Sequence, residues 1–336
     1  MRLLAASLLV LGVAATSAAG QVQIDKRRPA KKNGVVYIEN GFGSVKVIGW
    51  EKEEVAVTGT MAAGAEGVEL DGDKESVSID VSVPSAWTFG SDDDTDYRSN
   101  LQVSVPRGSS VQIQTVNAEI RVEGVEGALD LESVNGLIEV SGAPRAVDAE
   151  TMTGQVLIQA AAAEMRVESV AGSITLRGAA REVQVRSVSG KVDVSGKDFA
   201  QVEIETTASD VQFEGGFLAE GNFHLETFSG NVLMVLPADV AARFHLETFS
   251  GQIESDIGTK PRRTERFNPY MEMRFTTGFN EFDVSAKTYS GNIKVGLSRE
   301  AGGPPPKPPV PPKPPKPRPD KSDRPDKPDK ADRPDG

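Results

Sequence analysis

The residues in this chain best suited to chemistry are its two histidines, which lie in two copies of one heptapeptide. HLETFSG spans His224–Gly230 and again His245–Gly251. Imidazole and carboxylate groups both bind zinc, so a metal site would use His224 and His245 together with Glu226 and Glu247. The alternative is a single structural unit written twice. The choice depends on how the surrounding sequence folds.

The heptapeptide belongs to a longer internal repeat. If its final Gly is position zero, equivalent positions fall at Ala118, Gly136, Gly154, Gly172, Gly190, Ser209, Gly230, Gly251 and Gly291. Positions −7, −5 and +2 are apolar in all of these registers, and position −3 is always Ser or Thr. Alternating apolar positions indicate short strands, and glycine between them indicates sharp turns.

The repeat predicts an all-β fold. No amphipathic helix follows that could cover the apolar face, so we expect a β-solenoid in which each coil of about 18–21 residues contributes two strands. A β-sandwich or a long β-meander is the alternative. Either would explain the alternation, but neither would explain why the unit length stays at 18 residues over five consecutive zero positions.

In a solenoid the histidines would point outward, because position −6 lies between two inward positions. His224 and His245 should then stack on adjacent coils, yet a stable zinc site needs three or four ligands. The duplication is therefore interpreted as a copied coil, and the sequence predicts no catalytic residue, cofactor or metal. Four phenylalanines are expected to widen the core at these coils: Phe223, Phe228, Phe244 and Phe249.

Position −4 forms a second polar column, which holds Glu132, Glu150, Glu168, Arg186, Glu205, Glu226 and Glu247. Like charges on neighbouring strands are destabilising, so this column must face water, where salt screens the repulsion. A cation-binding strip is the sharper alternative. The acidic stretch Ser91–Tyr97 lacks the spacing of a calcium loop and is expected to be solvated.

The two ends differ from the body. Residues 1–20 have the layout of a secretory signal peptide, and the chain has no Cys and hence no disulfide. We expect a disordered segment over 21–34, a β capping region over 35–110, the solenoid over 111–297, and a disordered Pro/Lys/Asp-rich tail over 298–336. No transmembrane segment is expected in the mature protein.

Charge limits the choice of partner. The chain carries a net charge of −12, and without the cationic tail and Arg2 residues 21–303 carry −16. An acidic body argues against nucleic acid. The tail is a candidate for contact with an anionic envelope polymer, or else a solvated spacer. Between Gly258 and Phe279 a basic, aromatic segment is expected as an inserted hairpin or a degenerate coil, with candidate partner contacts at Arg262, Arg263, Arg266, Phe267, Tyr270 and Phe275.

The sequence resembles the bacterial putative-adhesin domain family. The resemblance rests on IENGFGSVKVIGWEKEEVAVTGT, LQVSVPRGSSVQIQTVNAEIRVEG and repeated units such as SVSGKVDVSG, and it covers roughly residues 35–297. That family is a domain of unknown function. The resemblance implies an exported β-repeat protein of the cell envelope or surface, and it brings no catalytic residues.

We therefore expect an exported, non-enzymatic, adhesin-like envelope protein that acts as a structural or binding scaffold. Its location would be the periplasm, the outer cell surface or the extracellular space. Its partner would be an envelope or surface component, either protein or polysaccharide. The alternative is a polysaccharide-active or polysaccharide-binding β-solenoid protein, which would need paired acids across a groove and exposed aromatic platforms.

Overall fold

The computed structural model describes residues 21–62, 67–82, 97–258, 260–263, 270–278 and 282–298. The expected signal peptide, most of the acidic stretch Ser91–Tyr97 and nearly all of the proline-rich tail lie outside these ranges. Contacts divide the chain into a unit Met1–Ala301 and a second unit, Gly302–Gly336, that also lies outside them.

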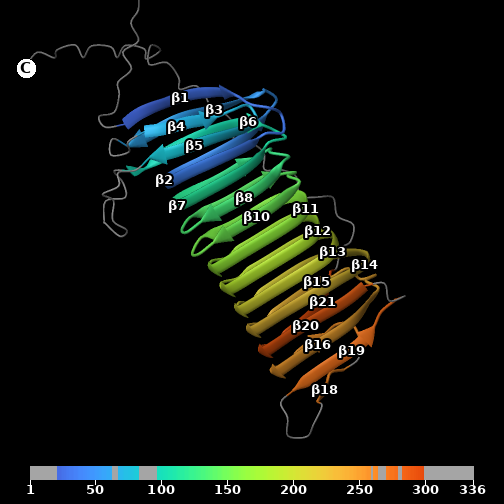
Figure 1. Ribbon diagram of the computed structural model, residues 1–336. Helices are drawn as coiled ribbons and strands as arrows, with labels where there is room; N and C mark the ends of the chain where they lie inside the picture. Colours follow the sequence, from blue (N-terminus) through green and yellow to red (C-terminus); the bar gives the residue numbers. More distant parts are fainter. Residues whose placement is uncertain are drawn as a thin grey trace, which may run out of the picture. The chain divides into compact units, whose positions relative to one another are not determined.

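The described residues form strands and no α-helix, which confirms an all-β repeat fold (Figure 1). The strands are β1 (Gln21–Pro29), β2 (Val35–Trp50), β3 (Glu54–Ala62), β4 (Gly67–Gly72), β5 (Ser76–Ser82), β6 (Ser99–Pro106), β7 (Ser110–Glu123), β8 (Ala128–Ser133), β9 (Leu137–Gly142), β10 (Ala146–Thr151), β11 (Gln155–Ala171), β12 (Ile174–Ser189), β13 (Val192–Ala208), β14 (Val211–Ser229), β15 (Val232–Leu236), β16 (Ala242–Ser250), β17 (Ile253–Ser255), β18 (Arg262–Arg263), β19 (Met271–Thr276), β20 (Phe282–Ser290) and β21 (Ile293–Leu297).

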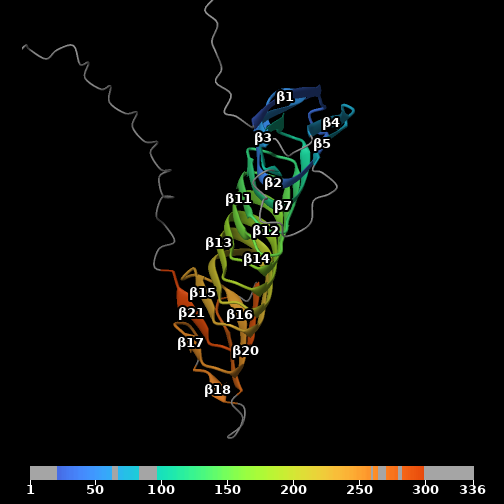
Figure 2. The ribbon, with the colours of Figure 1, turned by 90° about the vertical axis from the view of Figure 1, so that its left-hand side faces the viewer.

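Successive repeats pair in parallel, and equivalent residues face one another. In β10, Val147 lies opposite Leu129 of β8 on one side and Met165 of β11 on the other. After the corner the same holds, since Val156 lies opposite Ile138 and Ile174. Sequential antiparallel hairpins, as in a meander, are therefore not the arrangement of these repeats. Figure 2 shows the two faces of the stack from the side.

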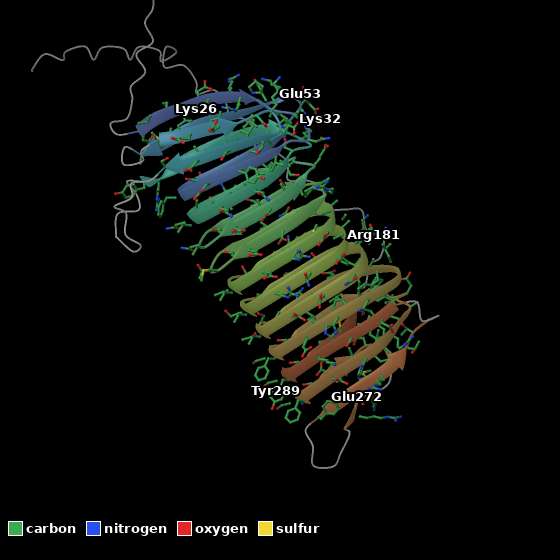
Figure 3. The ribbon with its side chains drawn as sticks, in the orientation of Figure 1. Lys26, Lys32, Glu53, Arg181, Glu272 and Tyr289 are labelled. Carbon is green, nitrogen blue, oxygen red and sulfur yellow. The ribbon has the colours of Figure 1, made fainter. Side chains whose placement is uncertain are left out.

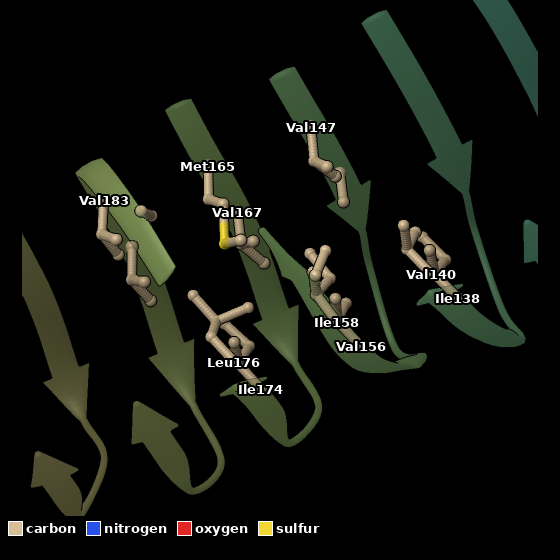
Figure 4. Packing of buried hydrophobic residues seen from close by; sticks show 14 of the residues in the cluster. Ile138, Val140, Val147, Val156, Ile158, Met165, Val167, Ile174, Leu176 and Val183 are labelled. Atoms are coloured by element: carbon tan, nitrogen blue, oxygen red, sulfur yellow. The ribbon is translucent and has the colours of Figure 1, made fainter. Parts of the chain in front are cut away.

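The apolar columns fill the space between the two faces. The strand before each corner contributes Val147, Met165 and Val183, and the strand after it contributes Ile158 and Leu176, all at most 2% exposed (Figure 4). Because equivalent residues lie one strand spacing apart, each apolar side chain packs on its counterparts above and below. The core is consequently continuous along the repeats.

The Ser/Thr and Gly positions close the corner. Thr151 Oγ1 accepts a hydrogen bond from the backbone N–H of Gly154 at 2.9 Å, and Thr248 Oγ1 donates to the carbonyl of Gly291 at 2.9 Å. A Cβ on Gly154 would clash with the carbonyl oxygen of Gly136 on the repeat below, and Gly190 has a φ of 115°. Glycine is needed where the backbone passes this closely or turns to positive φ.

The order of the repeats in space departs from their order in the sequence at the carboxyl end. β20 pairs with β14 on one side and with β16 on the other, so the last repeat lies between the two HLETFSG repeats. In Figure 1 the red β20 interrupts the colour gradient at this place. The link between β15 and β16, residues 237–241, has to pass two strand spacings, or about 10 Å, which five residues can reach.

The amino-terminal end has the same kind of exchange. β2 pairs in parallel with β7, and on its other side with β5 and β6. Part of the region expected as a cap, 35–110, is thus paired within the parallel stack. The strands β3 and β4 are antiparallel to β6 and β5, as β19 is to β16 at the other end.

The expectation of disorder over 21–34 is wrong for its first part. Residues Gln21–Pro29 form β1, which is antiparallel to β3. Only Ile24 of this strand is buried, and Arg28 donates a hydrogen bond to the carbonyl of Leu70 at 3.0 Å. The segment is mostly polar, and its backbone pairing with the edge of β3 is what orders it.

Replacing Val192 with Asp tests the inward assignment of the columns. Val192 is 0% exposed, so the variant would bury an unpaired carboxylate in the core. We expect the free energy of unfolding to fall by about 4 kcal/mol, measured by chemical denaturation followed by circular dichroism. Val188→Asp is the matched control: Val188 is 49% exposed, and its loss should be within about 0.5 kcal/mol. Equal losses would contradict the assignment.

Candidate functional site

A groove runs along the corner of the repeats, lined by the residues at positions −4, −3 and −2. One part has a volume of about 760 Å³ and extends from Glu39 to Thr207. A second part, of about 550 Å³, shares Glu205 and Thr206 with the first and continues to Glu247 and Tyr270. We call the two parts together the edge groove. It crosses many strands because each repeat contributes the same three positions.

One side of the edge groove is an apolar column formed by the residues at position −2. Its members in spatial order are Val116, Val134, Met152, Val170, Val188, Phe228, Tyr289 and Phe249, interrupted by Thr207 after Val188. Seven of them are large hydrophobic side chains that are 38–59% exposed. A row of exposed apolar side chains in one line is unusual for a surface without a partner.

The apolar column ends in three stacked aromatic rings. The centroid of Tyr289 lies 4.9 Å from that of Phe228 and 4.8 Å from that of Phe249, with planes within 6° of parallel. Figure 3 places Tyr289 at the edge of the stack, with its ring projecting away from the strands. The sequence expectation was wrong for Phe228 and Phe249, which are exposed, whereas Phe223 and Phe244 are buried in the core.

The opposite side of the edge groove is the charged column at position −4. Arg186 lies 3.0 Å from Glu168 and 3.4 Å from Glu205, so it pairs with both neighbours. The sequence-based picture of Glu226 directly beside Glu247 is wrong, because the inserted β20 places Lys287 between them. Lys287 Nζ lies 3.9 Å from Glu247 Oε2. The stacking order thus relieves part of the like-charge repulsion.

Three successive carboxylates, those of Glu132, Glu150 and Glu168, have no such interruption. Partial burial raises the pKa of Glu150, and the charges of Glu168, Asp148 and Glu132 raise it further. Burial also raises the pKa of Asp148, although the nearby Arg166 opposes this. Of these three acids only Glu168 has a cationic neighbour in the column, Arg186.

The two histidines do not stack. His224 and His245 both lie opposite Ser285 of β20, on its two sides, so a full repeat separates them. His245 instead meets the antiparallel β19: its Nε2 lies 2.5 Å from Glu247 Oε1 and 3.1 Å from Glu272 Oε1. The corresponding contact of His224, to Glu226, is 3.7 Å long.

The group around His245 is an ion-pair network. The ligand atoms of His245, Glu247 and Glu272 lie within 4.8 Å of one another, as metal ligands would. However, Arg274 pairs with Glu272, and Lys287 and Arg274 both approach Glu247 within 3.9 Å. Protein cations therefore already balance the two carboxylates.

The basic, aromatic segment after Gly258 is a hairpin, formed by β18 and β19. Tyr270 lines the end of the edge groove and forms a side-chain hydrogen bond with Glu247. Burial and this hydrogen bond raise the pKa of Tyr270 to about 12. Phe275 stacks on Phe244 at 4.5 Å and so covers the core. The side chain of Arg262 is exposed. The side chain of Arg263, and Arg266 and Phe267, lie outside the described part.

The apolar column was not predicted from the sequence, although the sequence contains a signal for it. Positions −7, −5 and −3 point inward, so strict alternation places −6, −4 and −2 outward. An apolar residue at −2 in eight of the nine registers is then an outward apolar row, which no core requires. Chemically, the edge groove offers an apolar side, a mainly anionic side and a hydroxyl-bearing base. Such a surface suits binding of an extended chain better than catalysis at one point.

Replacing each histidine with alanine separates the two copies of HLETFSG. His245→Ala leaves Glu247 facing Glu272 directly across β16 and β19, so we expect a loss of about 1 kcal/mol in the free energy of unfolding. His224→Ala is the matched control and should change it by less than about 0.5 kcal/mol. Thermal and chemical denaturation of both variants measure this difference, which equal losses would contradict.

The raised pKa of Glu150 predicts a pH effect with a defined sign. The folded state binds this proton more tightly than the unfolded chain, so stability falls as pH rises above the ordinary value of 4.5. Glu150→Gln removes that contribution and should be more stable than the parent at pH 7 but not at pH 4. Melting curves across this range provide the measurement, with Glu126→Gln, outside the groove, as the control. A pH-independent difference for Glu150→Gln would refute the assignment.

Comparison with known proteins identifies a family for most of this chain. Residues 35–296 match the family described as Toastrack DUF4097. Solved structures with low similarity include a "putative adhesin" from Parabacteroides merdae (8% identity, TM-score 0.43, covering 84% of this chain and 98% of that one). Another, from Parabacteroides distasonis, shares 9% identity with a TM-score of 0.36, covering 82% and 97%.

A "putative cell adhesion protein" from Clostridium sporogenes shares 8% identity with a TM-score of 0.26, covering 82% of this chain and 100% of that one. No curated protein matches the chain. The family match covers most of the chain and confirms the resemblance drawn from the repeats to a domain family of unknown function. The chain belongs to the Toastrack DUF4097 family.

Proposed function

We propose that this protein is an exported, non-enzymatic, adhesin-like scaffold of the cell envelope: a β-solenoid that binds an extended partner along its edge groove. The observation that carries the proposal is the apolar column, with seven large hydrophobic side chains 38–59% exposed in one line. Exposed apolar rows of this kind mark interaction surfaces.

The ladder geometry supports binding along a line. Equivalent side chains recur at the strand spacing, so a partner that runs across the strands meets the same chemistry at every repeat. In the described residues the acids of the groove are likewise spread along a column and are not gathered as a pair at one point. A polysaccharide-active protein would need such a pair around the scissile bond.

The aromatic rings favour a polypeptide or apolar partner over sugar binding. Tyr289 stacks face to face with Phe228 and Phe249, so both of its faces are covered. A sugar platform needs a free aromatic face, and the central ring of this stack offers only its edge. In addition, no helix in the described residues is long and apolar enough to cross a membrane.

Envelope binding through the groove can be tested with a paired variant of the full chain. Met152→Glu with Val170→Glu places two charges in the apolar column, where both parent side chains are about half exposed. We expect at least tenfold weaker cosedimentation with an envelope fraction. Val22→Glu is the control, since Val22 is 46% exposed but lies in β1, away from the groove. Unchanged cosedimentation of the paired variant would remove the proposal.

A further inference from the structure

We propose that the edge groove binds the proline- and lysine-rich segment of a second copy of this chain, residues 304–319, in an extended polyproline II conformation. The inference rests on the proposed function, because it uses the same groove, and it names the partner. Its consequence is self-association, in which each copy supplies a groove to one neighbour and a segment to another.

The charge of the groove selects the partner. The charged column contains seven carboxylates, those of Glu39, Glu132, Glu150, Glu168, Glu205, Glu226 and Glu247, against two cations, Arg186 and Lys287. Both cations already contact carboxylates of the column. Two copies that packed groove against groove would therefore repel each other. A cationic partner, by contrast, would relieve the repulsion around Glu150.

The chemistry of the groove fits proline. Proline-rich segments in polyproline II conformation bind to surfaces lined by aromatic and apolar side chains, because the segment is already extended before it binds. The apolar column supplies such a surface, and its aromatic end has Phe228 and Tyr289 about half exposed. Residues 304–319 read PPPKPPVPPKPPKPRP, with prolines at most positions and no acid.

The periodicities of the two partners agree. Polyproline II advances about 9.3 Å in three residues, and two strand spacings are about 9.6 Å. Lys307, Lys313 and Lys316 are separated by multiples of three residues, so their side chains lie on one side of the segment. Alternate repeats of the charged column present Glu132, Glu168 and Glu205. Lysines of the segment can therefore face carboxylates while the prolines between them face the apolar column.

The segment 304–319 is long enough to span the edge groove. Sixteen residues in this conformation span about 50 Å. The column from Glu39 to Glu247 crosses nine strand spacings, or about 43 Å. One segment can thus occupy the whole edge groove, and a shorter engagement would still meet several repeats.

Sedimentation velocity of the full chain across about two decades of concentration tests the proposal. We expect concentration-dependent oligomers that weaken at high salt, because exposed charges are screened. A synthetic peptide of residues 304–319 should bind the chain and dissociate the oligomers. Replacing Lys307, Lys313 and Lys316 with Glu, in the chain or in the peptide, should weaken association at least tenfold.

Exchanging the charges of the groove and the peptide is the more specific test. Glu132→Lys with Glu150→Lys in the groove should weaken self-association at least tenfold, and should restore binding of the peptide whose three lysines are replaced by Glu. Glu126→Lys, outside the groove, is the matched control and should leave association unchanged. Circular dichroism of each variant confirms that it is folded.

Several outcomes would overturn the inference. The inference is wrong if the full chain is monomeric at every concentration, or if the peptide does not bind. It is also wrong if the groove variant with two lysines does not bind the peptide with three glutamates. If the lysine variant loses self-association but still cosediments with the envelope, the inference stands together with the proposed function. If the Met152/Val170 variant loses envelope binding but the parent chain does not self-associate, the proposed function stands and the inference about its partner is wrong.

Discussion

The structure depends on one constraint: strands of successive repeats pair in parallel with equivalent residues opposite one another. Val147 lies between Leu129 and Met165, and Val156 lies between Ile138 and Ile174. Because the register is fixed, a residue type that recurs in the sequence becomes a column in space. Apolar positions become a continuous core, and glycines at the corner allow the backbones of neighbouring repeats to approach closely.

The same constraint produces the edge groove. Positions −4 and −2 point outward on either side of the buried Ser/Thr at position −3, so their side chains form parallel columns of acid and hydrocarbon with a hydroxyl column between them. A single repeat would offer one Glu, one Ser and one Val, which is an ordinary surface. Stacked repeats offer them at a fixed spacing along tens of ångströms, which is the geometry that the proposed extended partner requires.

Stacking order is a second variable that the register does not fix. At both ends, one repeat lies between two others that are closer to each other in the sequence than either is to it. β2 lies between β6 and β7, and β20 lies between β14 and β16. The insertion of β20 separates His224 from His245, places Lys287 between two glutamates, and completes the aromatic stack with Tyr289. Much of the distinctive chemistry of the carboxyl end therefore comes from this one exchange.

The sequence by itself determined the local content: strands, corners, repeat length, the inward columns and the family resemblance, all of which depend on alternation and spacing along the chain. It also contained the outward apolar row, which strict alternation places at position −2. Only the tertiary structure decided which repeats are neighbours, since a link of five residues can cross one strand spacing or two with a similar loss of chain entropy. It also decided that β1 is ordered, because Gln21–Pro29 pairs antiparallel with β3, and the residue types of the segment do not specify that pairing. Contacts between His245 and Glu272, or between Tyr289 and Phe249, depend on that choice of neighbours, and no spacing in the sequence encodes it.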